Sequence, residues 1–306
     1  MMADMARVKK LLVAWAVLAL SGGAFSVAQG EEPVFRFAPP DGTVCTETVT
    51  TKQTVELADG RSNGTTSELE IEWRIARTAT GYTRTETVTG GSSQSSHQET
   101  DLAVLKAIKG KPVTYTVDAD GRLVEVAGTE AVAEAIRKAL PANAAALAAK
   151  AFTRESQLAS ARAEWQARVG SYLGRSAAPG SAWLATDSYL LANGELVEYY
   201  TAVKVVRAET VGGHECVRVE YRLGRDPAEF KGFLGESYAT AAEGEQALPG
   251  KVVVSGGGSR LVDPMTLLCY GEELERRFDN VIMTMPGAGE MVITVRQKKS
   301  YGYSYR

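Results

Sequence analysis

The feature that most constrains the fold is a regular alternation of apolar and charged residues within residues 68–79. Leu69, Ile71, Trp73 and Ile75 occupy every second position, and charged residues stand between them. Successive side chains of an extended chain point to opposite faces, so this period of two predicts a strand with one buried face. A chain with several such strands is expected to form an antiparallel sheet that packs one face on a core.

Strand signals recur in two stretches of the chain. In residues 34–127 the predicted strands are 43–57, 68–79, 82–88, 113–117 and 123–126, and 90–98 is expected to be a polar loop. In residues 180–305 they begin at Trp183 and continue at 196–207, 215–223, 251–261, 267–278 and 292–305. Asp-Gly and Gly-Gly turns between them suit tight hairpins. The stretches therefore predict two meanders, and an old duplication and a chance match are the alternatives for their faint mutual similarity.

Residues 128–174 change period and predict a helical insert between the two meanders. An apolar stripe with steps of three and four is formed by Leu158, Ala161, Trp165, Val169 and Tyr172. Such a stripe is typical of a helix that docks one face on a partner. The predicted fold class is therefore α+β, a curved antiparallel sheet or half-barrel with a central helical insert, and residues 29–306 are expected to form a single β-rich domain.

Residues 1–28 show the three-part pattern of a secretory signal peptide. Basic residues precede an apolar run at 11–20, and Ser26 and Ala28 supply the small residues that signal peptidase accepts. The run is shorter than the roughly 20 residues that a bilayer-spanning helix needs. We therefore expect cleavage near Ala28, with an uncleaved anchor as the alternative. The expected location is periplasmic or secreted, with no membrane span after cleavage.

The net charge bears on the kind of partner that the protein can bind. A formal net charge of −3 argues against nucleic acid as a partner.

Cys45, Cys216 and Cys269 allow one disulfide in an oxidising compartment. Alternation places Cys216 and Cys269 on polar faces of strands two apart, where roughly 9.6 Å separates the strands, too far for a bridge. No pairing is assigned, and three free thiols are the alternative.

Patterns of metal and hydrolase sites are weak in this sequence. The chain has two histidines, His97 and His214, and neither has further ligands at the short spacings of zinc sites. Ser237 lacks the second glycine of the nucleophile elbow of serine hydrolases. We therefore expect no catalytic, cofactor-binding or metal-binding residues.

Two other motifs also have structural interpretations. The glycine run at 255–259 lacks the Lys-Ser/Thr ending of a phosphate loop and favours a bulge or bend in a strand. The glutamates within 68–72 and 272–275 are interpreted as solvated strand faces, although catalytic acid pairs meet only in the fold.

Aromatic residues on the predicted inner faces are the main functional signal. They are ordinarily core residues, but in a half-barrel they could line a cavity for an apolar ligand. The candidate lining residues are Trp73, Tyr115, Trp183, Tyr199, Tyr221, Phe230 and Phe233. The last two lie in residues 224–250, for which a mobile flap beside the cavity and an inert surface insertion are the alternatives.

The layout of the chain and one short motif carry a family resemblance. A signal peptide precedes long antiparallel strands, Asp-containing turns and a helical plug, and residues 179–183 look like the Gly-x-x-Trp that opens a strand in several secreted families. This layout, over residues 34–305, resembles bacterial periplasmic proteins of the lipoprotein-carrier type, including half-barrel families of uncharacterised function. In those carriers an incomplete β-barrel holds acyl chains and helices cover its mouth. The resemblance implies such a fold and, by analogy only, such a ligand.

The sequence thus predicts a non-enzymatic, exported cell-envelope protein that binds a lipid, a lipoprotein or another apolar partner. The alternative is a structural or assembly protein that contacts an envelope protein through strand edges and a tail containing Tyr301, Tyr303 and Tyr305. A third possible class is an enzyme with an unrecognised site. A fourth is an outer-membrane barrel, which the Ala-rich helix disfavours. A closed apolar cavity would favour the first, and convergent buried polar groups the enzyme.

Overall fold

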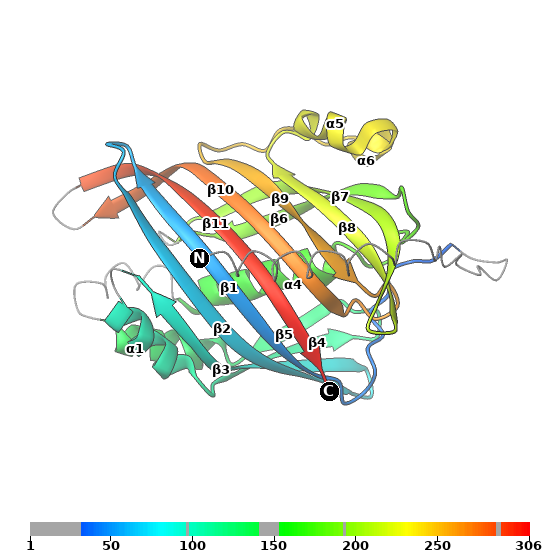
Figure 1. The fold of residues 1–306 in the computed structure, drawn as a ribbon, viewed down its shortest axis with the longest axis horizontal. Coiled ribbons are helices and arrows are strands. Elements are labelled where there is room, and N and C mark those ends of the chain that lie inside the picture. Colours follow the sequence, from blue (N-terminus) through cyan, green and yellow to red (C-terminus); the bar gives the residue numbers. More distant parts are fainter. Residues whose placement is uncertain (1–31, 96–97, 141–152, 192–193, 286–288) are drawn as a thin grey trace, which may run out of the picture. The chain divides into compact units, whose positions relative to one another are not determined.

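The computed structural model describes residues 32–95, 98–140, 153–191, 194–285 and 289–306. The protein is built around one large antiparallel sheet (Figure 1). Eleven strands of these described residues pair in the order β5-β4-β3-β2-β1-β11-β10-β9-β8-β7-β6. Strands that follow one another in the chain are paired, except β5 and β6, and β1 also pairs with β11. The two predicted meanders therefore lie side by side in one sheet. The predicted signal peptide lies outside the described residues.

The strands follow the predicted meanders. The first meander consists of β1 (Val44–Leu57), β2 (Ser62–Arg77), β3 (Gly81–Gln94), β4 (Pro112–Asp118) and β5 (Leu123–Ala127). The second consists of β6 (Ala182–Leu190), β7 (Leu196–Val211), β8 (His214–Gly224), β9 (Val253–Val262), β10 (Cys269–Met285) and β11 (Gly289–Tyr305). The alternation in β2 holds, because Trp73 and Ile75 face the core with 3% and 2% exposure.

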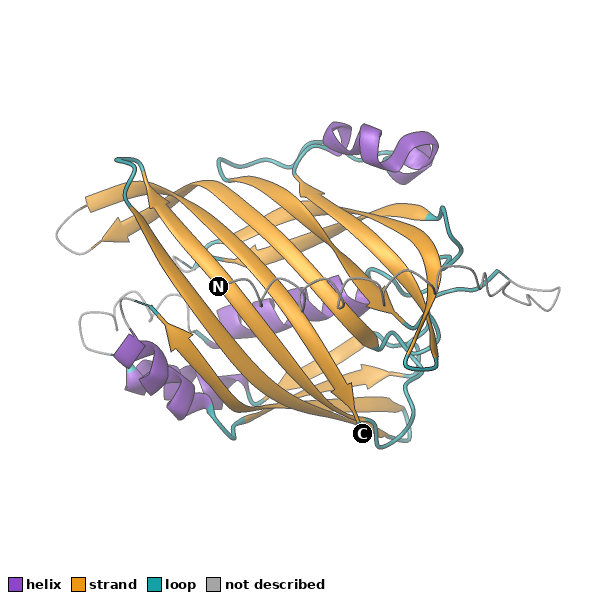
Figure 2. Cartoon of the chain, in the orientation of Figure 1, coloured by secondary structure: helices purple, strands orange, loops and turns teal. Residues whose placement is uncertain are grey.

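The sheet curves around helix α4 (Arg154–Trp165) without closing, which confirms the α+β half-barrel (Figure 2). A π-helical turn, η2 (Gln166–Gly170), continues the helix. The end strands β5 and β6 do not pair with each other, and α4 contacts both of them. Helix α4 therefore occupies the gap between the two edges of the sheet. No helix of the described residues is long and apolar enough to cross a membrane.

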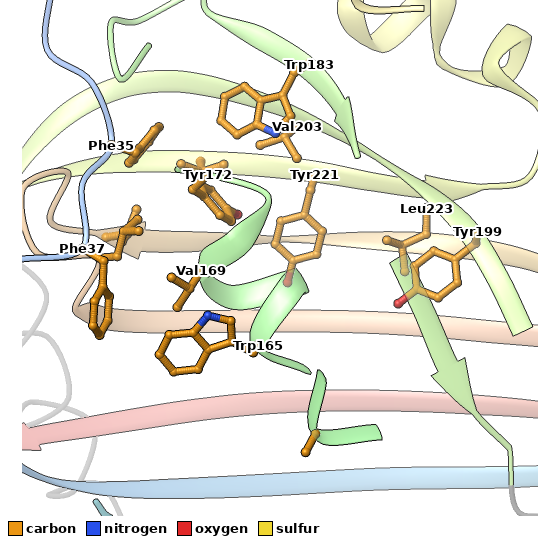
Figure 3. Close-up of a cluster of buried hydrophobic side chains, with 14 of the residues drawn as sticks. Phe35, Phe37, Trp165, Val169, Tyr172, Trp183, Tyr199, Val203, Tyr221 and Leu223 are labelled. Carbon is orange, nitrogen blue, oxygen red and sulfur yellow. The ribbon is translucent and has the colours of Figure 1, made fainter. Parts of the chain in front are cut away.

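The predicted apolar stripe docks α4 and η2 on the inner face. Ala161, Trp165, Val169 and Tyr172 are buried, and Leu158 is half-buried. The indole Nε1 of Trp165 donates to the carbonyl of Gly121 at 3.2 Å, and its ring stacks on Tyr115. Figure 3 shows Trp165 and Tyr172 within the surrounding aromatic cluster. Residues 141–152 of the insert lie outside the described residues.

The expected loop at residues 90–98 is wrong. Strand β3 continues to Gln94, and helix α1 (Gln98–Ile108) begins soon afterwards, packed against α2 (Thr129–Ala139). The hydroxyls of Ser93 and Ser95 donate to the carboxylate of Asp101 at 2.8 and 2.6 Å. The small polar residues that indicated a loop thus hold the first turn of a helix.

Residues 224–250 form short helices on the outer face of the sheet. They are η3 (Pro227–Phe230), α5 (Lys231–Leu234), η4 (Gly235–Ser237) and α6 (Tyr238–Ala241). Phe230 and Leu234 are buried in a second small core against Leu184 and Tyr200. Because α4 lies on the inner face, the expectation of a flap beside an interior cavity is wrong.

The cysteines are free, as in the alternative without a disulfide. Strand β9 separates Cys216 from Cys269 as predicted. The predicted polar placement is wrong, because Cys216 is fully buried and a register shift between Cys269 and Gly271 brings Cys269 beside the inner residue Glu272. Burial raises the pKa of Cys269 to about 11 and the pKa values of Cys45 and Cys216 to about 12.

The glycine run lies within β9, as predicted. Gly256 has a φ of +138°, a conformation that favours glycine. A Cβ atom there would clash with the backbone of Glu275, and one at Gly258 would lie 2.7 Å from the hydroxyl of Tyr221. The run therefore allows close approach of neighbouring backbone and an aromatic ring.

Candidate functional site

The inner face of the sheet carries charged side chains as well as apolar ones. Alternation places them beside core residues: in β10, Glu272 and Arg276 share the inner face with Leu274 and Phe278. We define the inner charge cluster as the charged residues of the sheet, α4 and η2 that meet there. Its members are Glu47, Arg84, Glu86, Glu164, Arg168, Arg260, Glu272, Arg276 and Lys299.

Arg168 and Glu47 connect the helix to the sheet. The guanidinium of Arg168 lies 3.0 and 3.3 Å from the two carboxylate oxygens of Glu47, which also accepts from the indole of Trp73 at 3.2 Å. Arg168 lies 3.4 Å from Glu164 and stacks over the ring of Tyr301. Both charges of the Arg168–Glu47 pair are largely withdrawn from water, so removal of either one would leave the other buried without a counter-charge.

A second ion pair joins Arg260 to Glu272 at 2.9 Å. Arg260 also donates to the carbonyl of Arg168 at 3.2 Å, where a cation complements the negative end of the helix dipole. The hydroxyls of Tyr221 and Tyr303 each lie 3.4 Å from the Glu272 carboxylate. Burial alone would raise the pKa of Glu272, but Arg260, Arg168 and Lys299 together outweigh it and hold that pKa below its ordinary value.

Arg276 and Lys299 lack such partners. Arg276 donates to the side-chain amide oxygen of Gln297 at 3.1 Å and lies 4.2 Å from the ring centre of Tyr189. Within the described part of the chain, neither cation has a carboxylate within 4.0 Å, and the Nε of Arg276 is buried without a hydrogen-bond partner. Burial, with Arg276 nearby, lowers the pKa of Lys299 to about 8.

A cavity of about 600 Å³ lies between α4 and this part of the sheet. We call it the inner pocket. Its charged lining consists of four cations and two acids, Arg168, Arg260, Arg276, Lys299, Glu164 and Glu272. Its main apolar and aromatic lining consists of Leu69, Tyr189, Leu190, Leu191, Tyr199, Leu274 and Tyr301. The pocket thus joins an apolar wall to an excess of positive charge, in a chain whose formal net charge is −3.

Five of the seven candidate lining aromatics lie in the main core. Tyr199 lines the inner pocket, Tyr221 lines an adjoining void of about 60 Å³, and Trp73 lines another of about 30 Å³. Tyr115 packs on α4 through Trp165, and Trp183 packs edge-on against Phe35 and Tyr172. Their role in binding stays a prediction.

Phe230 and Phe233 lie apart from the other five. They border an open groove of about 670 Å³ on the outer face, where Arg222 lies 5.7 Å from the ring centre of Phe233. The seven aromatic residues therefore do not form the wall of one cavity, because residues 224–250 fold back onto the opposite face of the sheet.

Sequence reasoning missed the charged residues of the pocket. The interpretation of Glu272 as a solvated residue is wrong, since it is 7% exposed, whereas Glu273 and Glu275 are exposed as expected. The available signal was the spacing of Arg276, which shares the period of Leu274 and Phe278.

The tyrosines near residue 305 also differ from expectation. Tyr303 and Tyr305 are half-buried against the main core, Tyr301 lines the inner pocket, and β11 pairs on both sides. They do not form the exposed tail on which the assembly alternative partly rested. His214 packs on Tyr270, His97 lies outside the described residues, and the described chain contains no cluster suited to a metal.

Comparison with known proteins gives weak similarities only. No family model and no curated protein matches the chain. DynF from the dynemicin biosynthesis pathway of Micromonospora chersina is 7% identical, with 94% of this chain and 92% of that chain covered and a TM-score of 0.23. A protein of Bacteroides fragilis described as exported, with a YmcC-like fold, is 11% identical over 86% of this chain and 96% of that one, with a TM-score of 0.23. A DUF1329 family protein of Desulfovibrio piger is 11% identical over 87% and 85%, with a TM-score of 0.12.

Proposed function

We propose that the protein is an exported, non-enzymatic binding protein that holds a lipid, a lipoprotein acyl chain or another apolar partner in the inner pocket. The pocket itself is the observation that carries this proposal. Its volume of about 600 Å³ falls within the roughly 300–1,000 Å³ typical of small-molecule sites. Export is proposed from the leader pattern at residues 1–28.

The lining of the pocket supports an apolar ligand. Leu69, Leu190, Leu191 and Leu274 supply aliphatic surface from three different strands and the segment after β6. On the helix side, small residues such as Ser160 and Ala163 leave space between α4 and the sheet. Each Å² of apolar surface that a ligand removes from water contributes about 25 cal/mol.

Lipid analysis tests this proposal. Protein purified from a periplasmic fraction without detergent should carry an amphiphile near one per chain, detected by mass spectrometry of the extracted lipids. Ala163→Trp should abolish lipid binding, because the indole fills the pocket. Arg162→Trp, on the exposed side of the same helix turn, should retain the bound lipid. Absence of bound lipid in the wild-type protein, together with no measurable binding of added amphiphiles, would refute the proposal.

The convergence of buried ionisable groups favours a catalytic role as the second candidate. Two of the acids, however, are held in ion pairs, Glu47 with Arg168 and Glu272 with Arg260, and the lowered pKa of Glu272 does not suit a general acid. The candidates differ in the fate of the ligand. A binding protein returns bound amphiphile with unchanged mass after prolonged incubation, whereas an enzyme returns a product.

A further inference from the structure

Arg276 and Lys299 differ from the other inner cations in lacking an acidic partner. Arg84 lies 2.7 Å from Glu86, and Arg168 and Arg260 have the glutamate partners described above. Among the described residues, no acid lies within 4.0 Å of Arg276 or Lys299. Asp187 on the edge strand β6 is a further acid of the interior, and it accepts a hydrogen bond from Thr201.

The two unpaired cations are neighbours on one wall of the inner pocket. Lys299 on β11 pairs in register with Leu274 on β10, and Arg276 follows two residues later on the same face. Side chains in such a diagonal relation lie roughly 7–8 Å apart or less. Both line the pocket, and Arg276 is 8% exposed. Two adjacent cations withdrawn from water repel each other, and an anion between them would relieve both the repulsion and the lost hydration.

The residues around this pair define the rest of the ligand. Leu274, Tyr189 and Tyr301 border the cations, and the leucines described above extend the apolar wall. The nearest acids of the pocket, Glu164 and Glu272, are already engaged with Arg168 and Arg260, so an incoming acid group meets an excess of positive charge.

We propose that the inner pocket binds an amphiphile with one acidic group, a carboxylate or a phosphate monoester, and that Arg276 and Lys299 hold that group while the leucines hold the chain. This inference rests on the proposed function, because it assigns the ligand class of the same pocket. Arginine and lysine both bind carboxylate and phosphate oxygens through charge-assisted hydrogen bonds.

Chain-matched probes test the inference. Delipidated full-length mature protein is titrated by calorimetry with dodecanoate, dodecyl phosphate and dodecanol, each below its micelle concentration. At least one acid should bind roughly ten- to a hundredfold more tightly than the alcohol, the factor expected of hydrogen bonds to charged groups. Arg276→Met and Lys299→Met should each remove much of this advantage and leave dodecanol binding unchanged.

Matched controls lie on the same strands. Arg277→Met and Lys298→Met remove exposed cations on the outer face and should preserve the preference for the acid. If Arg276→Met does not fold, Lys299→Met, with a half-buried side chain, decides the question alone.

The outcomes separate the two proposals. Tighter binding of an acid supports the inference, and the tighter of the two probes identifies the acid group. Equal binding of acids and alcohol, or an acid preference that persists in Lys299→Met, overturns the anion site and leaves the apolar pocket standing. Failure of all three probes to bind overturns the pocket as a lipid site and the anion site with it.

Discussion

At the scale of residues, the buried pair of Glu47 and Arg168 shows how strongly a few side chains hold the interior. Glu47 is 2% exposed and accepts from Arg168 and from Trp73. Its carboxylate therefore neutralises a cation on the helix side of the core and satisfies an indole on the sheet side. Replacement by a neutral group of the same shape removes the charge while it preserves the packing.

Glu47→Gln should lower the free energy of unfolding by about 3–5 kcal/mol, because it leaves the Arg168 guanidinium buried without its main counter-charge. Urea unfolding monitored by tryptophan fluorescence measures the change. Glu70→Gln, at an exposed position of β2, is the control and should change the value by less than about 0.5 kcal/mol. Equal effects of the two substitutions would show that the ion pair contributes no net stability.

Lys299 should make stability depend on pH above neutrality. Its pKa is lowered from 10.5 to about 8 by burial and by Arg276 and Arg168, which outweigh Glu164 and Glu272. Between these two pH values the unfolded chain binds more protons at this site than the folded chain, so the free energy of unfolding rises with pH.

The measurement compares wild-type protein with Lys299→Met at pH 8 and 10.5, the limits of that window. The stability of wild type relative to the variant should increase by up to roughly 3 kcal/mol across it. A difference that stays constant with pH would mean that Lys299 titrates normally in the folded protein.

At the scale of elements, α4 is the piece that fills the half-barrel, and Trp165 is its main contact. The ring packs on Phe37 and Tyr115, and its Nε1 bonds the carbonyl of Gly121 beside β5. One side chain thus joins the helix to the chain segment before β1 and to the edge of the first meander.

Trp165→Ala should destabilise the protein by about 3–5 kcal/mol, as expected when a large buried side chain is truncated. Thermal or urea unfolding gives the value, with Arg162→Ala on the exposed side of α4 as the matched control. A loss below about 0.5 kcal/mol, the usual surface value, would mean that the helix is not docked through this residue.

The elements that could be predicted from sequence are those with a clear period. Strand β2 and the stripe through Trp165 and Tyr172 follow from spacing alone, since burial of one face imposes it. Helix α1 could not be predicted in this way, because its first turn is stabilised by serines that otherwise suggest a loop.

The candidate site was less predictable for two physical reasons. A register shift at Cys269 reverses the face that simple alternation assigns to it. Inward charges such as Glu272 look like solvated residues until the partner strand is known, and Arg260, its partner, comes from β9. Ion pairing is a property of the assembled sheet, so the local sequence does not specify it.

At the scale of the whole molecule, one curved sheet presents two different faces. Its inner face holds α4, the aromatic core and the inner pocket, whereas its outer face holds the short helices of residues 227–241 in a separate small core (Figure 1). The half-barrel is filled with aromatic side chains near Phe35 and Trp183 and retains space beside Lys299. A single fold therefore combines a closely packed aromatic region with a region that retains a cavity.

The pairing of β1 with β11 in the middle of the sheet has a consequence for biosynthesis. The ribosome makes β1 before β2 to β10 and makes β11 after them, so the central seam of the sheet cannot close until all the intervening strands have been made. Until then β1 is an unpaired edge on one side, with Val49 and Val55 unshielded by their partners Tyr301 and Val295. Pairing of β1 with β11 therefore requires every intervening strand to be present, whereas hairpins such as β1–β2 can pair as soon as both of their strands have been made.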